Sequence, residues 1–314
     1  MNDQSAPAPP PGIYRDTPAW EYHAWPYCSQ SRLKLLAKSP ATARASMERP
    51  KDPTPQMKKG TALHCAVLEP NKFRDTYAQP EQCSALTGKG ERCRNAGAMR
   101  QAGRWFCRTK GHAPDGTFDA LQACPDYADV IGMHDALSAH PATREMLLRR
   151  TDTEISIVWD DAETGVRCKL RADFLIAPWQ TIGDIKTCAD ASEEGFAKAI
   201  WDYRYHQQAA FYLDGTRSAG LNYERFAFAC VEPEYPYLTA ARAITEAVVD
   251  IGRQRNRQLL RLWARCERSG KWPGFSDEFT DVDFPAWVWK KALDEITAAD
   301  EREAAEASEA DEMP

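Results

Sequence analysis

The sequence predicts an α/β domain in which a mixed β-sheet is flanked by helices, with a small insertion in one connection. Three observations support this fold class. Runs of β-branched or alternating apolar residues gather between residues 153 and 187, and stretches with helical spacing precede and follow them. In addition, 43% of the 314 residues are hydrophobic, which is sufficient for a substantial core.

Charge is distributed unevenly along the chain. The formal net charge is -6, but residues 294–314 contain nine acidic residues and one arginine, so residues 1–293 carry a net charge of +2. The total charge argues against a generally basic nucleic-acid binder, although the body is mildly basic. The segment 294–314 is predicted to be a solvated acidic tail rather than a partner-binding segment.

The cellular context follows from what the sequence lacks. No apolar stretch approaches the roughly 20 residues of a membrane span, and the N-terminal MNDQSAPAPPPG has neither the charged nor the apolar region of a signal peptide. We therefore expect a cytoplasmic protein without a membrane partner. The ten cysteines then indicate free thiols and a metal site rather than a disulfide framework.

The N-terminal elements are predicted first. The Pro- and Ala-rich residues 1–12 are expected to be a disordered tail, and the main domain is expected to span residues 13–293. One helix begins after the N-cap Ser29 and stops near Pro40, and a second occupies GTALHCAVLE before Pro70. Residues 81–116, rich in Gly, Cys, Arg and Lys, form the insertion, and residues 127–148 form a further helix.

The strands follow the insertion. TEISIVWD, VRCKLRADFLIA and TIGDIKT predict three strands in a meander, with a hairpin between the first two. Residues 192–215 return to helical spacing, residues 224–233 predict a fourth strand, and residues 239–270 predict a long helix that ends at Gly270.

Two acids and a lysine are predicted to meet on adjacent strands. Asp184 and Lys186 project from one side of their strand while Ile185 points into the core, and Asp173 joins them if the two strands are neighbours. Converging carboxylates repel unless a cation lies between them, and oxygen ligands suit Mg²⁺ or Mn²⁺. With a lysine to orient or deprotonate water, this set fits metal-assisted phosphodiester hydrolysis. The alternative is a cross-strand salt bridge worth ~0.2–1 kcal/mol.

Two helical pairs add to this set. Gly60 and His64 share one helical face, as do Gln208 and Tyr212. An imidazole can ligate a metal, and the amide and hydroxyl could steady the lysine or a phosphate. The alternatives are a hydrogen-bonded core histidine, a surface glutamine and a core tyrosine.

In this order and spacing, the motifs G-x-x-x-H, Asp, D-x-K and Q-x-x-x-Y resemble the RecB-like branch of the PD-(D/E)XK nuclease superfamily. The stretches GTALHCAVLEPNKF, IGDIKT, DYRYHQQAAFYLDG and KWPGF are similar to the nuclease domain of the phage and prophage exonuclease VIII (RecE) family. The resemblance implies a restriction-endonuclease-like mixed sheet. It also implies roles for eight residues. The metal ligands would be His64, Asp173, Asp184 and the carbonyl of Ile185. Lys186 would activate the attacking water. The supporting residues would be Gln208, Tyr212 and Glu154.

The resemblance further implies an activity. It predicts 5′ to 3′ digestion of linear double-stranded DNA in a bacterial or phage-infected cytoplasm, leaving 3′ overhangs for a RecT-like single-strand annealing partner. A ring-shaped homo-oligomer, such as a tetramer, is expected by the same analogy. Two alternatives remain: a RecB-like nuclease acting on single strands or flaps, and a catalytically silent DNA-binding adaptor.

The insertion carries its own candidate site. Three thiols and an imidazole, from Cys83, Cys93, Cys107 and His112, predict a tetrahedral Zn²⁺ site, with Cys124 as a substitute ligand. The segment resembles a treble-type or knuckle module. Its basic and aromatic side chains, among them Arg94, Arg104 and Trp105, would contact DNA phosphates and a base. The alternative is a structural flap with solvated charges.

Overall fold

The computed structural model describes residues 8–49, 52–119, 121–124 and 126–311. It separates into a larger unit ending at Pro273 and a smaller unit beginning at Gly274. In the smaller unit, helix α11 spans Ala286–Asp311. The predicted boundary between the main domain and the acidic tail, at residues 293 and 294, therefore falls inside a helix.

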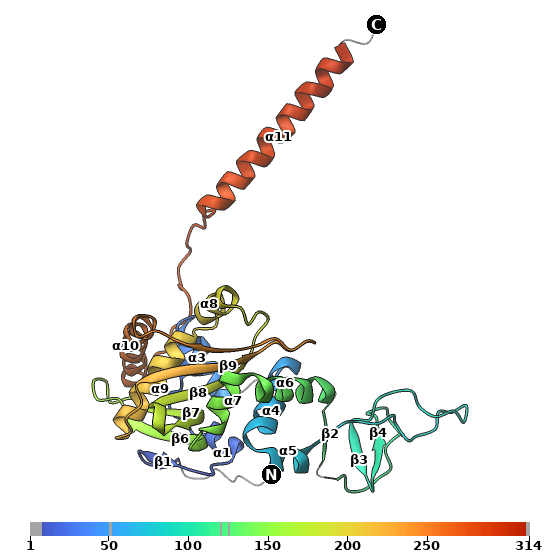
Figure 1. The fold of residues 1–314 in the computed structure, drawn as a ribbon. Helices are drawn as coiled ribbons and strands as arrows, with labels where there is room; N and C mark the ends of the chain where they lie inside the picture. Colours follow the sequence, from blue (N-terminus) through green and yellow to red (C-terminus); the bar gives the residue numbers. More distant parts are fainter. Residues whose placement is uncertain (1–7, 50–51, 120, 125, 312–314) are drawn as a thin grey trace. The chain divides into compact units, whose positions relative to one another are not determined.

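A six-stranded mixed sheet lies at the centre of the larger unit, in the order β1-β6-β7-β8-β9-β10 (Figure 1). Only β8 and β9 run parallel, and the other neighbours are antiparallel. The strands are β1 (Gly12–Tyr14), β6 (Asp152–Asp160), β7 (Arg167–Ile176), β8 (Thr181–Thr187), β9 (Arg225–Val231) and β10 (Thr239–Ala243). The predicted mixed sheet and the hairpin of its first two strands are confirmed.

Strand β10 corrects the prediction of one helix over residues 239–270. Its Ala-rich sequence favours a helix locally, but its backbone pairs with β9 from Thr239 to Ala243. Ala240 packs toward the core on one face of the sheet and Ala241 toward the core on the other. Pairing and burial on both faces outweigh local propensity here. The helix begins only at α10 (Glu246–Ser269) and ends at Gly270, as predicted.

Prolines begin several of the helices. Pro40, Pro70 and Pro141 each occupy the first helical position, where a missing amide hydrogen costs nothing. The predicted helix over 127–148 is therefore two helices, and the one over 192–215 is also divided, at Arg204. The helices are α1 (Ala19–Ala24), α2 (Gln30–Leu36), α3 (Pro40–Glu48), α4 (Pro55–Leu68), α5 (Pro70–Thr76), α6 (Tyr127–Ala139), α7 (Pro141–Leu148), α8 (Glu193–Asp202) and α9 (Tyr205–Ser218), with a 3₁₀ turn at Ala177–Trp179.

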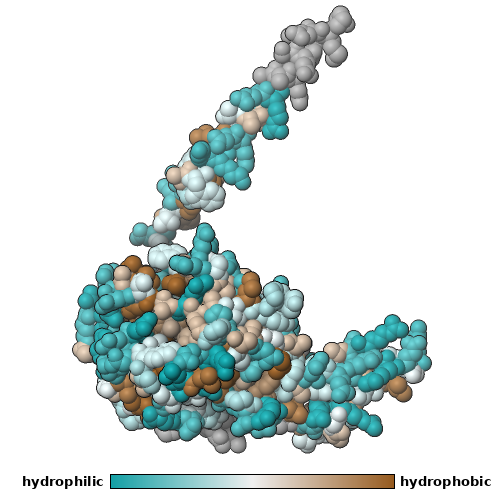
Figure 2. Space-filling view, viewed as in Figure 1, coloured by the Kyte–Doolittle hydropathy of each residue, from teal (hydrophilic) through white to brown (hydrophobic). Residues whose placement is uncertain are grey.

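Helices cover both faces of the sheet, as predicted. One core contains Leu170 and Phe228 with side chains from α2, α3, α8, α9 and α10. The opposite core contains Phe174 and Ile185 with side chains from α4, α5, α6 and α7. Figure 2 shows that polar side chains cover much of the visible surface of this unit. Among the described residues, no helix is both long and apolar enough to cross a membrane.

The insertion leaves and rejoins the body through paired strands. Strand β2 (Tyr77–Ala78) runs parallel to β5 (Gln122–Ala123), and between them β3 (Met99–Gln101) and β4 (Arg104–Phe106) form a hairpin. The paired strands thus enclose the predicted segment 81–116.

The N-terminal tail is only partly as predicted. Residues 1–7 lie outside the described chain. Residues 9–12 are ordered by contacts, because the Tyr14 hydroxyl donates to Pro10 O at 2.6 Å and the Tyr27 hydroxyl to Pro9 O at 2.7 Å. Strand β1 then begins at Gly12.

Candidate active site

Strands β7 and β8 separate at the candidate site. They pair only where Phe174–Ile176 faces Thr181–Gly183. Beyond this point the Asp173 carboxylate takes the place of a backbone partner, and its Oδ2 accepts a hydrogen bond from Ile185 N at 2.8 Å. The amide and carbonyl of one strand residue point toward the same neighbour. The Ile185 carbonyl therefore also faces this opening, which we call the fork.

Helix α4 brings His64 to the fork. Its Nε2 lies 3.0 Å from the Ile185 carbonyl oxygen, and its Nδ1 lies 3.3 Å from Asp173 Oδ2. Burial lowers the pKa of His64, but the attraction and hydrogen bond of Asp173 outweigh burial and raise the pKa to about 9. The histidine therefore contacts both strands of the fork.

Glu154 completes a three-residue cluster. Ligand atoms of His64, Glu154 and Asp173 lie within 4.8 Å of one another. Glu154 has a left-handed backbone with φ 53, which is strained for a residue other than glycine. Its carboxylate forms an ion pair with Arg171. The sequence predicted Glu154 only as a supporting residue, and its left-handed backbone has no local sequence signal.

Asp184 and Lys186 project to the same side of β8, as predicted, and form a buried ion pair. Asp184 is 2% exposed, and its Oδ1 accepts a hydrogen bond from Gln208 Nε2 at 2.6 Å. Its Oδ2 faces the ammonium without a hydrogen bond of good geometry. Burial raises the pKa of Asp184, Lys186 opposes this and the nearby Asp173 adds to it, and together they bring the pKa to about 6.

The structure brings together only part of the predicted metal-ligand set. Asp184 lies outside the three-residue cluster, which contains Glu154 beside His64 and Asp173, and its role as a ligand stays a prediction. Gln208 steadies the carboxylate of Asp184 rather than contacting Lys186 directly. Alternation along a strand predicts the direction of a side chain but not which neighbouring group it meets.

Two tyrosines of α9 lie near these groups. Tyr212 is half-buried, its ring centroid lies 6.0 Å from that of Phe226 in an edge-to-face arrangement, and burial raises its pKa. Tyr205, which the sequence analysis missed, places its ring 5.1 Å from the Lys186 ammonium. Its position three residues before Gln208, on the same helical face, was the available signal.

The fork contains donors that suit a hard divalent cation. Asp173 and Glu154 supply carboxylate oxygens and His64 an imidazole nitrogen. The Ile185 carbonyl oxygen lies 3.0 Å from that imidazole. Asp184, on β8, adds a third carboxylate, whose pKa is raised by burial and by the charge of Asp173. Such an oxygen-rich donor set with one imidazole fits Mg²⁺ or Mn²⁺.

Gly183 allows β7 and β8 to pack closely beside the fork. A Cβ at this position would lie 2.0 Å from Cε2 of Phe174, whose ring is fully buried. We expect Gly183→Ala to lower the free energy of unfolding by about 1–3 kcal/mol. It should also displace β7 from β8 where Asp173 and Asp184 meet. Urea denaturation measures the first effect and nuclease assays the second.

A matched control for this substitution is Gly88→Ala, because a Cβ there would meet nothing within 4 Å. We expect its free energy of unfolding to stay within about 0.5 kcal/mol of the wild-type value. Equal stability and activity of the two variants would contradict the role assigned to Gly183.

The insertion brings its four predicted zinc ligands together. Ligand atoms of Cys83, Cys93, Cys107 and His112 lie within 4.8 Å of one another. Cys107 Sγ is 3.2 Å from His112 Nδ1 and 3.9 Å from Cys93 Sγ. Hydrogen bonds from Thr109 help lower the pKa of Cys107 to about 5, which favours the thiolate that a metal needs. Cys124, the substitute ligand, instead packs in the core beside α4.

Only some of the residues predicted to contact DNA lie on the surface of the insertion. Arg94 and Arg104 are exposed. Trp105 is only 3% exposed, and it packs so closely on Gly97 that a Cβ added there would lie 2.4 Å from the Cβ of Trp105. The expectation that Trp105 stacks on a base is therefore wrong, because its ring is needed inside a module with little other core.

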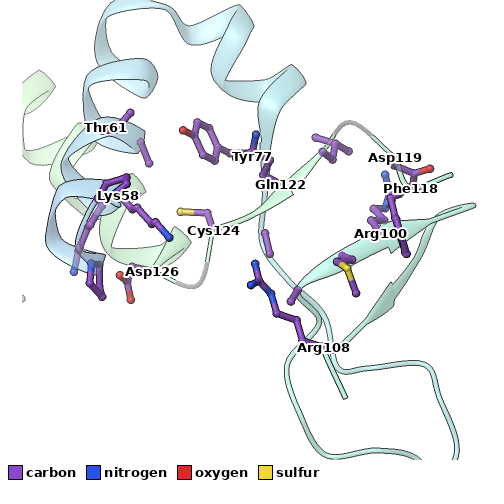
Figure 3. A pocket seen from close by; sticks show the side chains of 18 residues that line it. Lys58, Thr61, Tyr77, Arg100, Arg108, Phe118, Asp119, Gln122, Cys124 and Asp126 are labelled. Atoms are coloured by element: carbon purple, nitrogen blue, oxygen red, sulfur yellow. Dashed lines mark ion pairs between the residues drawn. The ribbon is translucent and has the colours of Figure 1, made fainter. Parts of the chain in front are cut away.

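A cavity of about 890 Å³ lies between α4 and the insertion (Figure 3). Lys58 lines it from α4, and Arg100 and Arg108 line it from the insertion. Asp119 also lines it and lies 3.8 Å from Arg100 as an ion pair. The cavity is a mixed-charge recess on the helix that carries His64, separate from the fork itself.

Comparison with known proteins agrees with this architecture. The sequence model of a family described as "PDDEXK-like domain of unknown function (DUF3799)" matches residues 29–281. A crystal structure named "Putative exonuclease", from Eubacterium rectale, has a similar fold, with a TM-score of 0.51 and 11% sequence identity. The similarity covers 82% of this chain and 91% of that chain. No curated protein sequence matches the chain.

Proposed function

Because the chain belongs to the family of PDDEXK-like domains, we propose that it is a nuclease that hydrolyses DNA phosphodiester bonds with a divalent metal ion. The observation that carries this proposal is the meeting of acidic side chains from separate strands with His64 and Lys186 at the fork. The resemblance of the sequence motifs to RecB-like nucleases supports the same reaction.

Each fork residue receives a role. His64, Glu154 and Asp173 would hold the metal, with oxygen donors available from Ile185 and Asp184. When bound, Mg²⁺ or Mn²⁺ would lower the pKa of a water molecule and offset charge on the phosphate. The attraction of Asp184 and Asp173 overcomes burial and raises the pKa of Lys186, so its ammonium stays charged.

Lys186 would therefore orient the attacking water and stabilise the developing negative charge rather than act first as a base. Gln208 would keep Asp184 aligned through its 2.6 Å hydrogen bond. Tyr212, packed between α9 and β9, would support the helix that carries Gln208.

The substrate we propose is the end of linear double-stranded DNA. The similarity of the sequence to the exonuclease VIII family supports 5′ to 3′ digestion that leaves a 3′ overhang. The name of the Eubacterium rectale structure, "Putative exonuclease", is consistent with attack at ends. On the same analogy we propose a ring-shaped homo-oligomer and an annealing protein as partner. The complete set of fork residues argues against a silent adaptor.

We also propose that the insertion holds one structural Zn²⁺ through Cys83, Cys93, Cys107 and His112. Three thiolates and an imidazole at these separations suit tetrahedral zinc. The exposed Arg94 and Arg104 would then contact DNA phosphates.

Parallel digestion of 5′-labelled and 3′-labelled linear duplex tests the activity and its polarity. We expect loss of the 5′ label as mononucleotide with Mg²⁺ or Mn²⁺, no release with EDTA, and no cleavage of a covalently closed circle. Release of the 3′ label first would reverse the polarity. Cutting of the circle would replace the exonuclease by an endonuclease, and inactivity on every DNA would refute the proposed function.

A further inference from the structure

Exposed aromatic side chains gather where α8 ends and α9 begins, between residues 201 and 205. Trp201 is 59% exposed and Tyr203 is 56% exposed. Neither ring fills the core, although each is large and would ordinarily be buried. We call Lys34, Trp201, Tyr203, Arg204 and Tyr205 the corner platform.

Cations lie over both exposed rings. The Arg204 guanidinium is 4.6 Å from the centroid of the Trp201 ring, and the Lys34 ammonium is 5.6 Å from that of Tyr203. Lys34 also donates to Tyr203 O at 3.2 Å. The nearby carboxylate of Asp202 is paired with Lys198. Positive charges therefore lie beside both rings. The nearby acid Asp202 is already paired with Lys198 and does not neutralise them.

A continuous series of ring contacts joins the platform to the fork. The rings of Tyr203 and Tyr205 stack with centroids 5.7 Å apart. The Tyr205 ring in turn lies 5.1 Å from the Lys186 ammonium. Burial lowers the pKa of Lys34, and repulsion from Arg204 and Lys186 lowers it further. These three cations are therefore close enough to interact electrostatically. Exposed rings therefore lead directly to the lysine at the fork.

We propose that the corner platform binds unpaired nucleotides of the DNA strand that enters the fork. Bases would stack on Trp201 and Tyr203, and phosphates would contact Arg204 and Lys34. This inference rests on the proposed nuclease function and deepens it, because it names the substrate form that the site prefers.

The chemistry of the platform selects this occupant. Two exposed aromatic rings, each with one cation beside it, match the alternation of flat bases and anionic phosphates along a single strand. Bases within a duplex are already stacked on their neighbours and offer no open face. An apolar protein helix would have to cover two cations without neutralising them. The platform therefore predicts that DNA ends with unpaired nucleotides bind better than blunt ends.

Four full-length variants test the platform: Trp201→Ala, Tyr203→Ala, Trp201→Phe and Trp179→Ala. The last is a matched control. Trp179 is 36% exposed and has the Arg149 guanidinium 5.7 Å from its ring, but it lies in the 3₁₀ turn that precedes β8. The fork lies toward the other end of that strand.

Binding is measured in EDTA, without hydrolysis, by fluorescence anisotropy of a labelled oligothymidine and of duplexes with blunt ends or unpaired overhangs. We expect wild-type protein to prefer the overhang, and each alanine variant at Trp201 or Tyr203 to bind oligothymidine about tenfold more weakly. Trp201→Phe should keep most of the affinity, and Trp179→Ala all of it. Thermal unfolding of each variant shows whether it is folded.

Equal affinity of wild-type protein for blunt and overhanging ends would overturn the inference, as would alanine variants that are folded and bind normally. Equal losses in Trp179→Ala would also overturn it. Cleavage of linear duplex by wild-type protein with Mg²⁺ is measured separately. Its absence would refute the proposed nuclease, whereas normal cleavage with unaffected variants would refute only the platform.

Discussion

Replacing Asp184 with asparagine is expected to reduce Mg²⁺-dependent cleavage of linear duplex DNA by at least about 10³-fold. The substitution keeps the shape of the side chain but removes a buried negative charge that lies beside Lys186 and near Asp173. A neutral amide attracts a divalent ion and the ammonium much more weakly than a carboxylate does, because it carries no net charge. Cleavage of an end-labelled duplex at several Mg²⁺ concentrations measures the loss.

Stability distinguishes this loss from unfolding. Removing one partner of a buried ion pair costs about 3–5 kcal/mol, because the other charge is left uncompensated. Asp184→Asn should therefore unfold at lower urea concentration than wild type. The double variant Asp184→Asn, Lys186→Met removes both charges, so we expect it to recover much of the stability and none of the activity.

A control for charge removal is Asp160→Asn. Asp160 forms an exposed ion pair with Arg167 at 2.8 Å on the same sheet, and such a pair contributes at most about 1 kcal/mol. We expect this variant to cleave DNA at the wild-type rate. Full activity of Asp184→Asn would refute the role of the fork, and inactivity of Asp160→Asn would show that the assay responds to surface charge alone.

Replacing Cys107 with serine is expected to abolish zinc binding by the insertion. Cys107 lies within 4 Å of both His112 and Cys93, and it is the ligand whose lowered pKa favours the thiolate. Wild-type protein should contain about one zinc ion per chain and the variant almost none. Because little apolar core remains in the module, we also expect rapid proteolysis between β2 and β5 in the variant.

Elemental analysis of the purified protein and limited trypsin digestion check these outcomes. Cys124→Ala is the control, because Cys124 packs beside α4 and lies outside the cluster. It should retain zinc and protease resistance. Zinc-free wild-type protein, or loss of zinc in Cys124→Ala, would contradict the proposed ligand set. If Cys107→Ser cleaves DNA normally, the module has a structural role and does not contact the substrate.

Local patterns predicted most of the fold correctly. The runs between residues 153 and 187 became adjacent strands β6, β7 and β8 because strand periodicity is visible in the sequence. The edge strand β10 was missed, since its alanines carry no such pattern and its pairing with β9 involves only the backbone. Breaks at Pro141 and Arg204 were also missed, where one helical pattern continues through two helices.

The sequence by itself determined which groups are available at the fork and the directions in which several of them point. Alternation along β8 requires Asp184 and Lys186 to share a side, and the cysteines with His112 carry the composition of a zinc site. Both follow from covalent spacing, which acts over a few residues.

The tertiary structure alone decided which of these groups meet. It placed Glu154 rather than Asp184 with His64 and Asp173, and it turned Gln208 toward Asp184. These contacts depend on where β7 separates from β8 and on how α4 and α9 pack across opposite faces of the sheet. Such distances are set by burial of the whole core, which no local stretch of sequence specifies.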